Sequence, residues 1–392
     1  MKSSFLPISH ELHCAACNFT FQQNQINTFC THCGQSPIEV QFDLAKSIPK
    51  EIINQNERSM WRYAKILPLI NNENKVSLGE GWTPILTMPR LAAELNINNL
   101  FIKDESFNPT GSFKARGLSM AVSKAKELGI RSMIVPTAGN AGGALSAYCA
   151  KAGIESIVVM PTHTPDAFKK ECKAFGAELI LVNGLINDCA QLVAKIKNDR
   201  DCFDVSTMKE PFRLEGKKTL GYEIAEQMNW TLPDVILYPA GGGTGLIGIW
   251  KAFKEMLSMG WITNVPTRMI AVQAQNCKPL VDTFTQKQPD SSKYQGMPTI
   301  ANGLAVPRPF AEQMMLKVLA QSKGTALAVS EQEITNSVKE IAVKEGMLVA
   351  PEGAALLAAL KVLLNSGQIF KDERILLLNT GSCYKYLENF EF

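Results

Sequence analysis

A lysine that follows a turn rich in glycine and hydroxyl residues is the strongest chemical feature of this chain. Lys114 comes directly after the sequence Asn-Pro-Thr-Gly-Ser-Phe, between an expected strand at 100–103 and an expected helix at 114–128. The first turn of a helix carries a partial positive charge, which disfavours an ammonium group there. This field and partial burial favour the neutral amine, the form that makes a Schiff base with a carbonyl compound. The alternative is a solvated lysine on an amphipathic helix.

Three more stretches follow expected strands and precede helices or turns. The segment 136–143 contains Asn140, 241–245 has four glycines in five positions, and 378–382 closes the last expected strand. Ligands of open parallel sheets gather beyond the carboxyl ends of strands, where helix starts offer unpaired N–H groups. Each stretch is therefore a candidate part of a binding site. Packing, a flexible loop or a simple turn would also explain these residues.

Two Cys-x-x-Cys pairs lie near the N-terminus, with twelve residues between them: Cys14 with Cys17, and Cys30 with Cys33. Four thiolates in paired turns suit tetrahedral Zn²⁺ and would close its coordination shell, so the predicted metal is structural. Redox cysteines or free thiols are the alternatives, but a redox Cys-x-x-Cys motif needs a βαβ context that this polar segment lacks. We expect that the segment cannot form a core without metal.

Composition and charge narrow the class of protein. The chain has 392 residues, of which 46% are hydrophobic, and a net charge of only +3. This charge is too small to indicate a nucleic-acid or membrane-surface partner, and we predict neither. We find no long apolar run and no signal-peptide pattern. The ten cysteines of a chain without a secretory signal are expected to be reduced. The predicted location is therefore cytoplasmic. A histidine-based hydrolase in the main body would have to use His163, in a Pro-bracketed loop, so acid-base work by a lysine fits better.

Short apolar segments alternate with amphipathic ones from Leu100 onward. This pattern is typical of an α/β protein with mostly parallel sheets covered by helices on both faces. Expected strands are 100–103, 132–136, 156–160, 178–182, 234–238, 268–273, 325–329 and 374–378, and expected helices include 114–128, 142–152, 165–175, 187–199 and 213–229. A shorter helical patch is expected at Trp61 to Leu69, before the turn Gly79-Glu80-Gly81.

The motif around Lys114 resembles the cofactor-lysine motif of the fold type II pyridoxal-phosphate (PLP) enzymes, the tryptophan-synthase-β type. Threonine synthases and threonine dehydratases are the most similar groups, and the resemblance covers roughly residues 75 to 390. It implies that Lys114 binds pyridoxal 5'-phosphate and moves protons. It also implies two open α/β domains facing a PLP cleft: a larger one from 41–118 and 233–392 and a smaller one at 119–232, after a zinc-ribbon-like segment at 1–40. Homodimers are usual for this fold.

The same resemblance assigns roles to the other stretches. Asn140 would contact the phenolic oxygen of the cofactor, and the backbone of Thr137, Ala138 and Gly139 would bind the substrate carboxylate. Thr380 would face the pyridine nitrogen, with Ser382 as the second choice. The cup for the cofactor phosphate would consist of Gly241, Gly242, Gly243, Thr244 and Gly245.

The segment that begins at Arg213 resembles the Arg-Leu-Glu-Gly stretch of threonine synthases, in which the arginine contacts the substrate phosphate. Arg213 and Lys217 are therefore expected to bind substrate, and the predicted reaction converts O-phospho-L-homoserine and water to L-threonine and phosphate. The alternative is that this segment is a solvated helix face. Ala141 stands where the commoner threonine synthases have a hydroxyl residue. A serine or threonine ammonia-lyase, or a β-replacement enzyme such as a cysteate-synthase-like one, is therefore the alternative function.

Overall fold

The computed structural model describes residues 7–44 and 48–391, so the parts of the expected segments at 1–6, 45–47 and 392 lie outside it. The chain divides into two compact units. Unit 1 consists of Met1–Trp82, Lys114–Glu223 and Ile247–Asn264. Unit 2 consists of Thr83–Phe113, Ile224–Leu246 and Val265–Phe392. Each unit contains a parallel sheet, which confirms the predicted α/β class.

Unit 2 is built on a six-stranded sheet in the order β13-β12-β11-β14-β6-β5. Only β5 runs antiparallel to its neighbour; the other strands are parallel. The middle strands are nearly continuous apolar runs, as expected for a sheet that is covered on both faces. The strands are β5 (Ile85–Thr87), β6 (Asn99–Asp104), β11 (Val235–Pro239), β12 (Arg268–Ala274), β13 (Thr325–Val329) and β14 (Arg374–Asn379).

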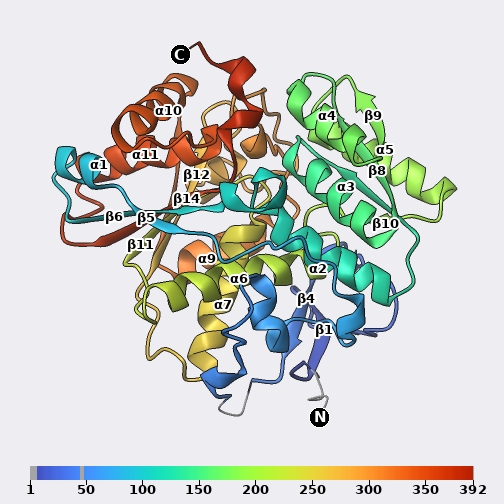
Figure 1. Ribbon diagram of the computed structural model, residues 1–392. Coiled ribbons are helices and arrows are strands. Elements are labelled where there is room, and N and C mark those ends of the chain that lie inside the picture. The colour runs from blue at the N-terminus through green and yellow to red at the C-terminus, as the bar shows by residue number, and fades with distance from the viewer. Residues whose placement is uncertain (1–6, 45–47, 392) are drawn as a thin grey trace. The chain divides into compact units, whose positions relative to one another are not determined.

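Helix α11 (Pro351–Asn365) is the main cover of this sheet and packs on β11, β12, β13 and β14 (Figure 1). Its sequence is apolar almost all round, which suits a helix with few solvent-exposed positions. α10 packs on α11 and on α1, and a capping box of Ser330 and Glu333 fixes its start. The remaining bounds are α1 (Pro89–Glu94), α8 (Pro279–Phe284), α9 (Glu312–Gln321) and α10 (Glu331–Glu345).

Unit 1 contains a four-stranded parallel sheet in the order β10-β7-β8-β9. Alternate residues of β7 enter different cores: Met133 and Val135 pack with α2 and α3, whereas Ile134 packs with α5. The strands are β7 (Ser132–Pro136), β8 (Glu155–Pro161), β9 (Glu178–Val182) and β10 (Phe203–Asp204). The helices are α2 (Lys114–Glu127), α3 (Asn140–Ala152), α4 (Asp166–Ala174), α5 (Ile186–Asp199), α6 (Phe212–Gln227) and α7 (Thr244–Ser258). The last residues of α6 and the first residues of α7 are assigned to unit 2.

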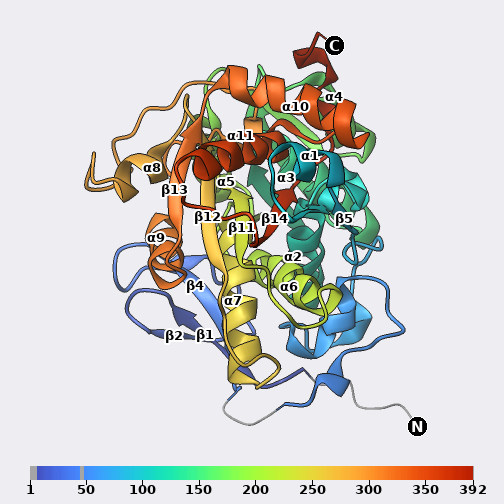
Figure 2. The same cartoon turned by 90° about the vertical axis from the view of Figure 1, so that its left-hand side faces the viewer.

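The N-terminal segment of unit 1 forms an antiparallel sheet in the order β2-β1-β4-β3, and β4 lies beside α7 (Figure 2). Its buried residues Leu12, Ile38 and Val40 share one core with Met120 of α2 and Phe212 of α6. The segment thus takes part of its core from the rest of the unit, which the sequence did not predict. The strands are β1 (His10–Cys14), β2 (Thr20–Phe21), β3 (Phe29–Cys30) and β4 (Ser36–Phe42).

The helical patch expected at Trp61 to Leu69 is a shorter 3-10 helix, Met60–Ile66, with a kink at Tyr63. Pro68 follows two residues later and cannot extend a helical hydrogen-bond ladder. The other 3-10 helices are Lys50–Ile52, Asn72–Asn74, Glu105–Phe107, Pro109–Gly111, Asn302–Leu304, Cys383–Lys385 and Leu387–Asn389.

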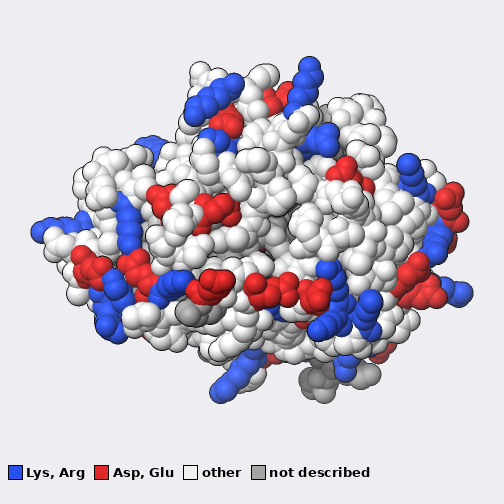
Figure 3. Space-filling model, turned by 90° about the horizontal axis from the view of Figure 1, so that it is seen from above, with Lys and Arg blue, Asp and Glu red and all other residues white. Residues whose placement is uncertain are grey.

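The surface shows no dominant sign of charge on the face drawn in Figure 3, where basic and acidic side chains lie side by side. Within the described ranges, the helices are too short or too polar to cross a bilayer.

Candidate active site

Lys114 is the first residue of α2, as predicted, and its side chain is half-buried. The residues before it are held firmly in unit 2. Ser112 forms a β-bridge with Gly381, and the N–H of Phe113 donates to the carbonyl oxygen of Thr380 at 3.1 Å. Upstream, the amide of Asn108 donates to Glu105 at 2.9 Å. The chain therefore enters α2 from a backbone that is fixed against the end of β14.

Three predicted site segments of unit 2 lie at one edge of its sheet. β6, β14 and β11 are consecutive parallel strands, so their carboxyl ends meet at this edge. The turn that leads to Lys114 follows β6, Thr380 follows β14, and Gly241 comes shortly after β11. This is the edge at which open α/β sheets bind ligands.

The glycine loop between β11 and α7 has no room for a side chain at Gly241 or Gly243. A Cβ atom on Gly241 would lie 2.2 Å from the carbonyl oxygen of Gly303. One on Gly243, where φ is +79°, would lie 2.2 Å from Sδ of Met315. Within the part of the chain that the structure describes, no hydrogen bond uses the N–H groups of Gly242, Gly243 or Thr244. Bare N–H groups at a helix start fit a phosphate group.

The last glycine of this loop is held by a buried phenol. The N–H of Gly245 donates to the hydroxyl oxygen of Tyr238 on β11. Burial raises the pKa of this phenol above its ordinary value, so the hydroxyl is neutral. The ring of Phe113 packs edge-on against Tyr238 with 6.3 Å between centroids. One aromatic pair therefore links the loop to the residue before Lys114.

Thr380 and Ser382, the two candidates for the residue facing the pyridine nitrogen, differ in their contacts. The hydroxyl of Ser382 accepts the N–H of Tyr384 at 3.3 Å and caps a 3-10 helix. Thr380 is only 7% exposed, and its hydroxyl makes no hydrogen bond to any residue that the structure describes. The geometry therefore favours Thr380 for a contact with a ligand.

In unit 1, the side chain of Thr137 stabilises the loop that follows β7. The hydroxyl of Thr137 accepts the N–H groups of Gly139 at 2.9 Å and Gly142 at 3.3 Å, so this side chain shapes the loop. Gly139 has φ +136°, and a Cβ there would lie 2.9 Å from the ring of Phe168. Ala138 is half-buried, and Asn140 is the first residue of α3. The predicted binding loop is thus a rigid turn at a helix start.

The predicted substrate cations lie in the first turns of α6, and both are almost fully buried: Arg213 is 1% exposed and Lys217 0%. The guanidinium of Arg213 donates to the carbonyl oxygen of Val205. Its Nε has no hydrogen-bond partner among the described residues. Burial lowers the pKa of Arg213, although nearby carboxylates oppose this shift. This burial excludes the alternative that the segment is a solvated helix face.

A carboxyl group caps the start of α6. Glu210 accepts the N–H of Phe212 at 2.7 Å and the N–H of Arg213 at 3.0 Å. Burial raises the pKa of Glu210 to about 7, and the charge of Arg213 opposes this rise. α6 also packs closely on α2: a Cβ on Gly216 would lie 2.1 Å from the carbonyl oxygen of Arg116. The helix that begins with Lys114 and the helix that carries Arg213 therefore touch through backbone.

Two buried carboxylates near these helices were not predicted from the sequence. Glu223 of α6 forms two hydrogen bonds with Arg116 of α2, at 2.8 and 2.9 Å, and both side chains are fully buried. Its partner lies 107 residues away in the chain, so no local pattern could reveal the pair. Glu80 occupies the Gly-Glu-Gly turn but points inward to Tyr148 and Ser119. Gly79 and Gly81 predicted the turn, but they gave no information on the direction of the Glu80 side chain.

The four cysteines of the N-terminal sheet come together, with all four sulfur atoms within 4.8 Å of one another. The Sγ atoms of Cys14 and Cys33 are 3.4 Å apart, and those of Cys17 and Cys30 are 3.8 Å apart. Zinc–sulfur bonds of about 2.3 Å in a tetrahedron place neighbouring sulfurs about 3.8 Å apart. The four thiols therefore have the chemistry and the spacing that Zn²⁺ requires.

Comparison with known proteins agrees with this geometry. Residues 76–381 match the family model described as "Pyridoxal-phosphate dependent enzyme". The threonine synthase of Methanocaldococcus jannaschii is 35% identical over 372 residues, covering 94% of this chain and 91% of the relative. That of Methanosarcina acetivorans is 32% identical over 379 residues, covering 96% and 92%. That of Mycobacterium tuberculosis is 32% identical and covers 82% of this chain and 87% of the relative.

Solved structures share the fold at lower identity. An L-serine ammonia-lyase from Rhizomucor miehei is 23% identical, with a TM-score of 0.65, and covers 79% of this chain and 98% of its own. A pyridoxal 5'-phosphate-dependent aspartate racemase is 20% identical, with a TM-score of 0.65, and covers 76% and 90%. The predicted fold type II architecture is thereby confirmed, and the chain belongs to the family of pyridoxal-phosphate dependent enzymes.

Proposed function

We propose that this chain is a threonine synthase, which converts O-phospho-L-homoserine and water to L-threonine and phosphate. The observation that carries this conclusion is the similarity, at 35% identity over 94% of the chain, to a threonine synthase. The similarity to ammonia-lyases rests on solved structures at 23% identity or less and supports the fold alone.

The residues of the chain supply distinct parts of this reaction. Bound pyridoxal phosphate would supply an electron sink that makes the substrate Cα–H acidic. The amine of Lys114 holds the cofactor and then accepts the proton from Cα. The unpaired N–H groups of Gly242, Gly243 and Thr244 would hold the cofactor phosphate, and the hydroxyl of Thr380 would contact the ring nitrogen. In the loop from Thr137 to Asn140, the N–H groups of Thr137 and Gly139 already donate to Val159 and to the Thr137 hydroxyl. The N–H of Ala138 would therefore bind the substrate carboxylate, and the amide of Asn140 would contact the cofactor oxygen.

The γ-phosphate of the substrate requires cations of its own. Arg213 and Lys217 are buried on the helix that packs against α2, and the Nε group of Arg213 is available for a ligand. A guanidinium that is not fully used by the protein suits a phosphate dianion. These two side chains are therefore the proposed substrate-phosphate site, in place of the loop hydroxyl that Ala141 lacks.

We also infer that Cys14, Cys17, Cys30 and Cys33 hold one structural Zn²⁺. Four thiolates close the tetrahedral shell and leave no position for a substrate. The support is the spacing of the sulfur atoms and the place of Cys14 and Cys30 in the core shared with α2 and α6. The cytoplasmic location, the homodimer and the division into domains at 41–118 with 233–392 and at 119–232 stay predictions. Light scattering of the purified protein tests the homodimer.

The decisive experiment supplies O-phosphohomoserine, L-serine and L-threonine separately to the purified protein. Inorganic phosphate and threonine should appear together from the first compound and depend on Lys114, so that Lys114→Ala abolishes both the activity and the visible absorption of lysine-bound cofactor. A 2-keto acid from serine or threonine, without phosphate release from O-phosphohomoserine, would establish an ammonia-lyase and overturn the proposal.

A further inference from the structure

Glu80 is a fully buried carboxylate, and both of its oxygen atoms are occupied. Oε1 accepts the indole N–H of Trp61 at 2.8 Å and the hydroxyl of Ser119 at 2.5 Å. Oε2 accepts the hydroxyl of Tyr148 at 2.6 Å and the backbone N–H of Leu78 at 2.9 Å. A buried carboxylate is stable only when such donors replace water. Glu80 therefore has a specific structural task.

The two hydroxyl donors belong to the two helices that begin with proposed cofactor-binding residues. Ser119 lies on α2, which begins with Lys114, and Tyr148 lies on α3, which begins with Asn140. At a rise of about 1.5 Å per residue, the two helix starts are roughly 7.5 Å and 12 Å from these contacts. α2 and α3 also pack against each other. A displacement at Glu80 is thus transmitted to both helix starts.

The turn that carries Glu80 has little freedom to move. Gly79 and Gly81 have φ values of +91° and +94°, which side chains rarely allow. A Cβ on Gly81 would lie 2.5 Å from the backbone nitrogen of Met60, whose N–H donates to the carbonyl oxygen of Glu80 at 2.6 Å. The carboxylate is therefore delivered from a fixed backbone.

We propose that Glu80 is a positioning residue: its carboxylate fixes α2, the helix of Lys114, against α3, the helix of Asn140. It thereby sets the position of the lysine amine relative to the loop that ends at Asn140. The residue itself does not touch the substrate or the cofactor. The inference rests on the proposed threonine synthase activity for its kinetic readout and on cofactor binding for its spectroscopic one.

A carboxylate offers an acceptor oxygen to each side of this site. Each oxygen of Glu80 faces one N–H group that cannot turn away: Trp61 on one side and Leu78 on the other. In Glu80→Gln the amide NH₂ must face one of these N–H groups in either orientation, because the amide has a single acceptor oxygen. The isosteric substitution therefore loosens the link without removing volume.

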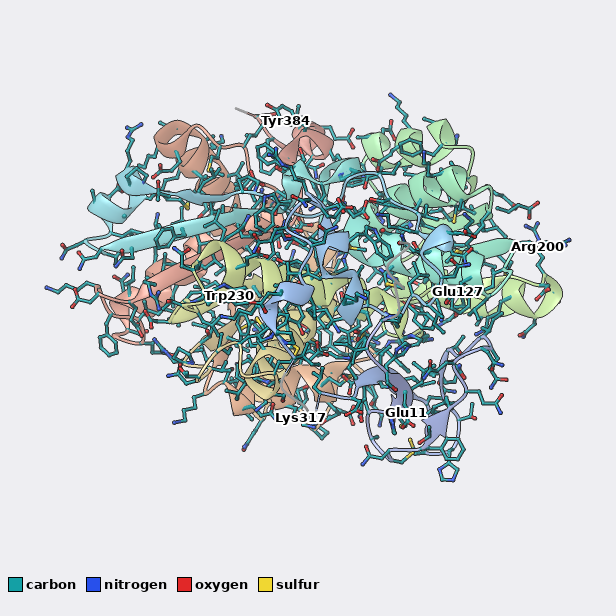
Figure 4. The ribbon with its side chains drawn as sticks, turned by 60° about the horizontal axis from the view of Figure 1, so that its bottom comes forward. Glu11, Glu127, Arg200, Trp230, Lys317 and Tyr384 are labelled. Atoms are coloured by element: carbon teal, nitrogen blue, oxygen red, sulfur yellow. The ribbon has the colours of Figure 1, made fainter. Side chains whose placement is uncertain are left out.

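A matched control lies on the same helix. Glu127, labelled in Figure 4, is the last residue of α2, and its Oε1 accepts the N–H groups of Ile70 at 2.9 Å and Asn71 at 2.7 Å. In Glu127→Gln the amide oxygen keeps both N–H contacts. The variant loses only the ion pair with Lys124, which is 2.5 Å long. It therefore disturbs α2 at the end opposite to Lys114.

The experiment measures kcat, KM for O-phosphohomoserine, the visible circular dichroism of bound cofactor, and Tm. Glu80→Gln should still bind pyridoxal phosphate but lose up to about 100-fold in kcat, since a misplacement of about 1 Å has effects of this size. KM should change less than kcat, and the visible dichroism should change. Glu127→Gln should keep kcat and the dichroism of the wild type.

Single-donor variants keep the proposal testable if Glu80→Gln does not fold. Tyr148→Phe and Ser119→Ala each release one helix, and each should lower kcat and alter the visible dichroism by a smaller amount. A folded Glu80→Gln with a lowered Tm but unchanged kcat and dichroism would overturn the proposal, and so would silent single-donor variants. If the wild type releases no phosphate, the proposed function fails, while the dichroism of the same variants still decides the role of Glu80.

Discussion

Phe113 donates its backbone N–H to the carbonyl oxygen of Thr380, with 3.1 Å between the two atoms. The bond ties the residue before Lys114 to the residue after β14. The same backbone segment is paired again where Ser382 N–H donates to the carbonyl oxygen of Gly111 at 2.8 Å. Residues 111–113 and residues 380–382 of unit 2 are thus held together by one short ladder.

Replacing Thr380 by valine tests the proposed contact with the cofactor ring. Thr380→Val removes the hydroxyl but keeps the β-branched shape, and the backbone bond to Phe113 is preserved. The loss of one hydrogen bond should lower kcat roughly 3-fold to 10-fold, with the cofactor still bound. Ser382→Ala, which removes only a cap of a 3-10 helix, is the control. A silent Thr380→Val beside an impaired Ser382→Ala would transfer the role to Ser382.

Gly243→Ala should weaken cofactor binding. The new methyl group would collide with Met315, and the φ of +79° adds strain, so the loop must shift away from the position that cups the phosphate. Gly260→Ala is a matched control, because its φ is +70° but nothing lies within 4 Å of the added carbon. Titration with pyridoxal phosphate should show weaker binding only for Gly243→Ala, whereas both variants lose about 1–2 kcal/mol of stability from the left-handed backbone. Equal cofactor affinity in both variants would contradict the proposed cup.

Local sequence patterns predicted the main strands and helices because their periodicity is local. β7 and β8, for example, occupy the expected segments to within one residue at each end. The glycine loop was also recognisable, since four glycines between a strand and a helix have few other uses. The composition of the Cys-x-x-Cys pairs was sufficient to predict that their sulfur atoms meet.

Contacts between distant segments could not be predicted in this way. The pairing of Arg116 with Glu223 and the inward direction of Glu80 depend on helix packing that no local window contains. The backbone of Thr137 and Gly139 was expected at the substrate, but the hydroxyl of Thr137 accepts the N–H of Gly139 within the loop itself. Hydrophobic periodicity could not predict the order of strands in each sheet either, because that order depends on the path of the connections between strands.

Cys14→Ser should reduce the zinc content and destabilise unit 1. Cys14 is fully buried in the core that contains Phe212 of α6, so loss of the metal also loosens packing near Arg213. A metal that binds only the folded state stabilises it by about 4 kcal/mol when its free concentration is 1,000-fold above Kd. Elemental analysis and thermal unfolding measure the two effects. Cys202→Ser, a half-buried thiol outside the cluster, should keep one zinc per chain. Absence of zinc from the wild type would refute the structural metal.

Glu210→Gln tests the buried carboxyl at the start of α6 through the pH dependence of stability. Burial raises the pKa of Glu210 from 4.5 to about 7. The folded state then binds more protons than the unfolded state between these two values. The stability contributed by the group is therefore fully present below pH 4.5 and is lost as the pH rises towards 7.

The expected result is a difference between the wild type and Glu210→Gln that falls between pH 4.5 and 7, by on the order of 3 kcal/mol at most. Urea unfolding at several pH values measures the free energy of unfolding of both proteins. Subtracting the two curves isolates Glu210, because the other titrating groups are common to both. A difference that rises with pH would show the opposite balance: the N–H groups of Phe212 and Arg213 and the guanidinium charge would then outweigh burial and hold the carboxyl ionised.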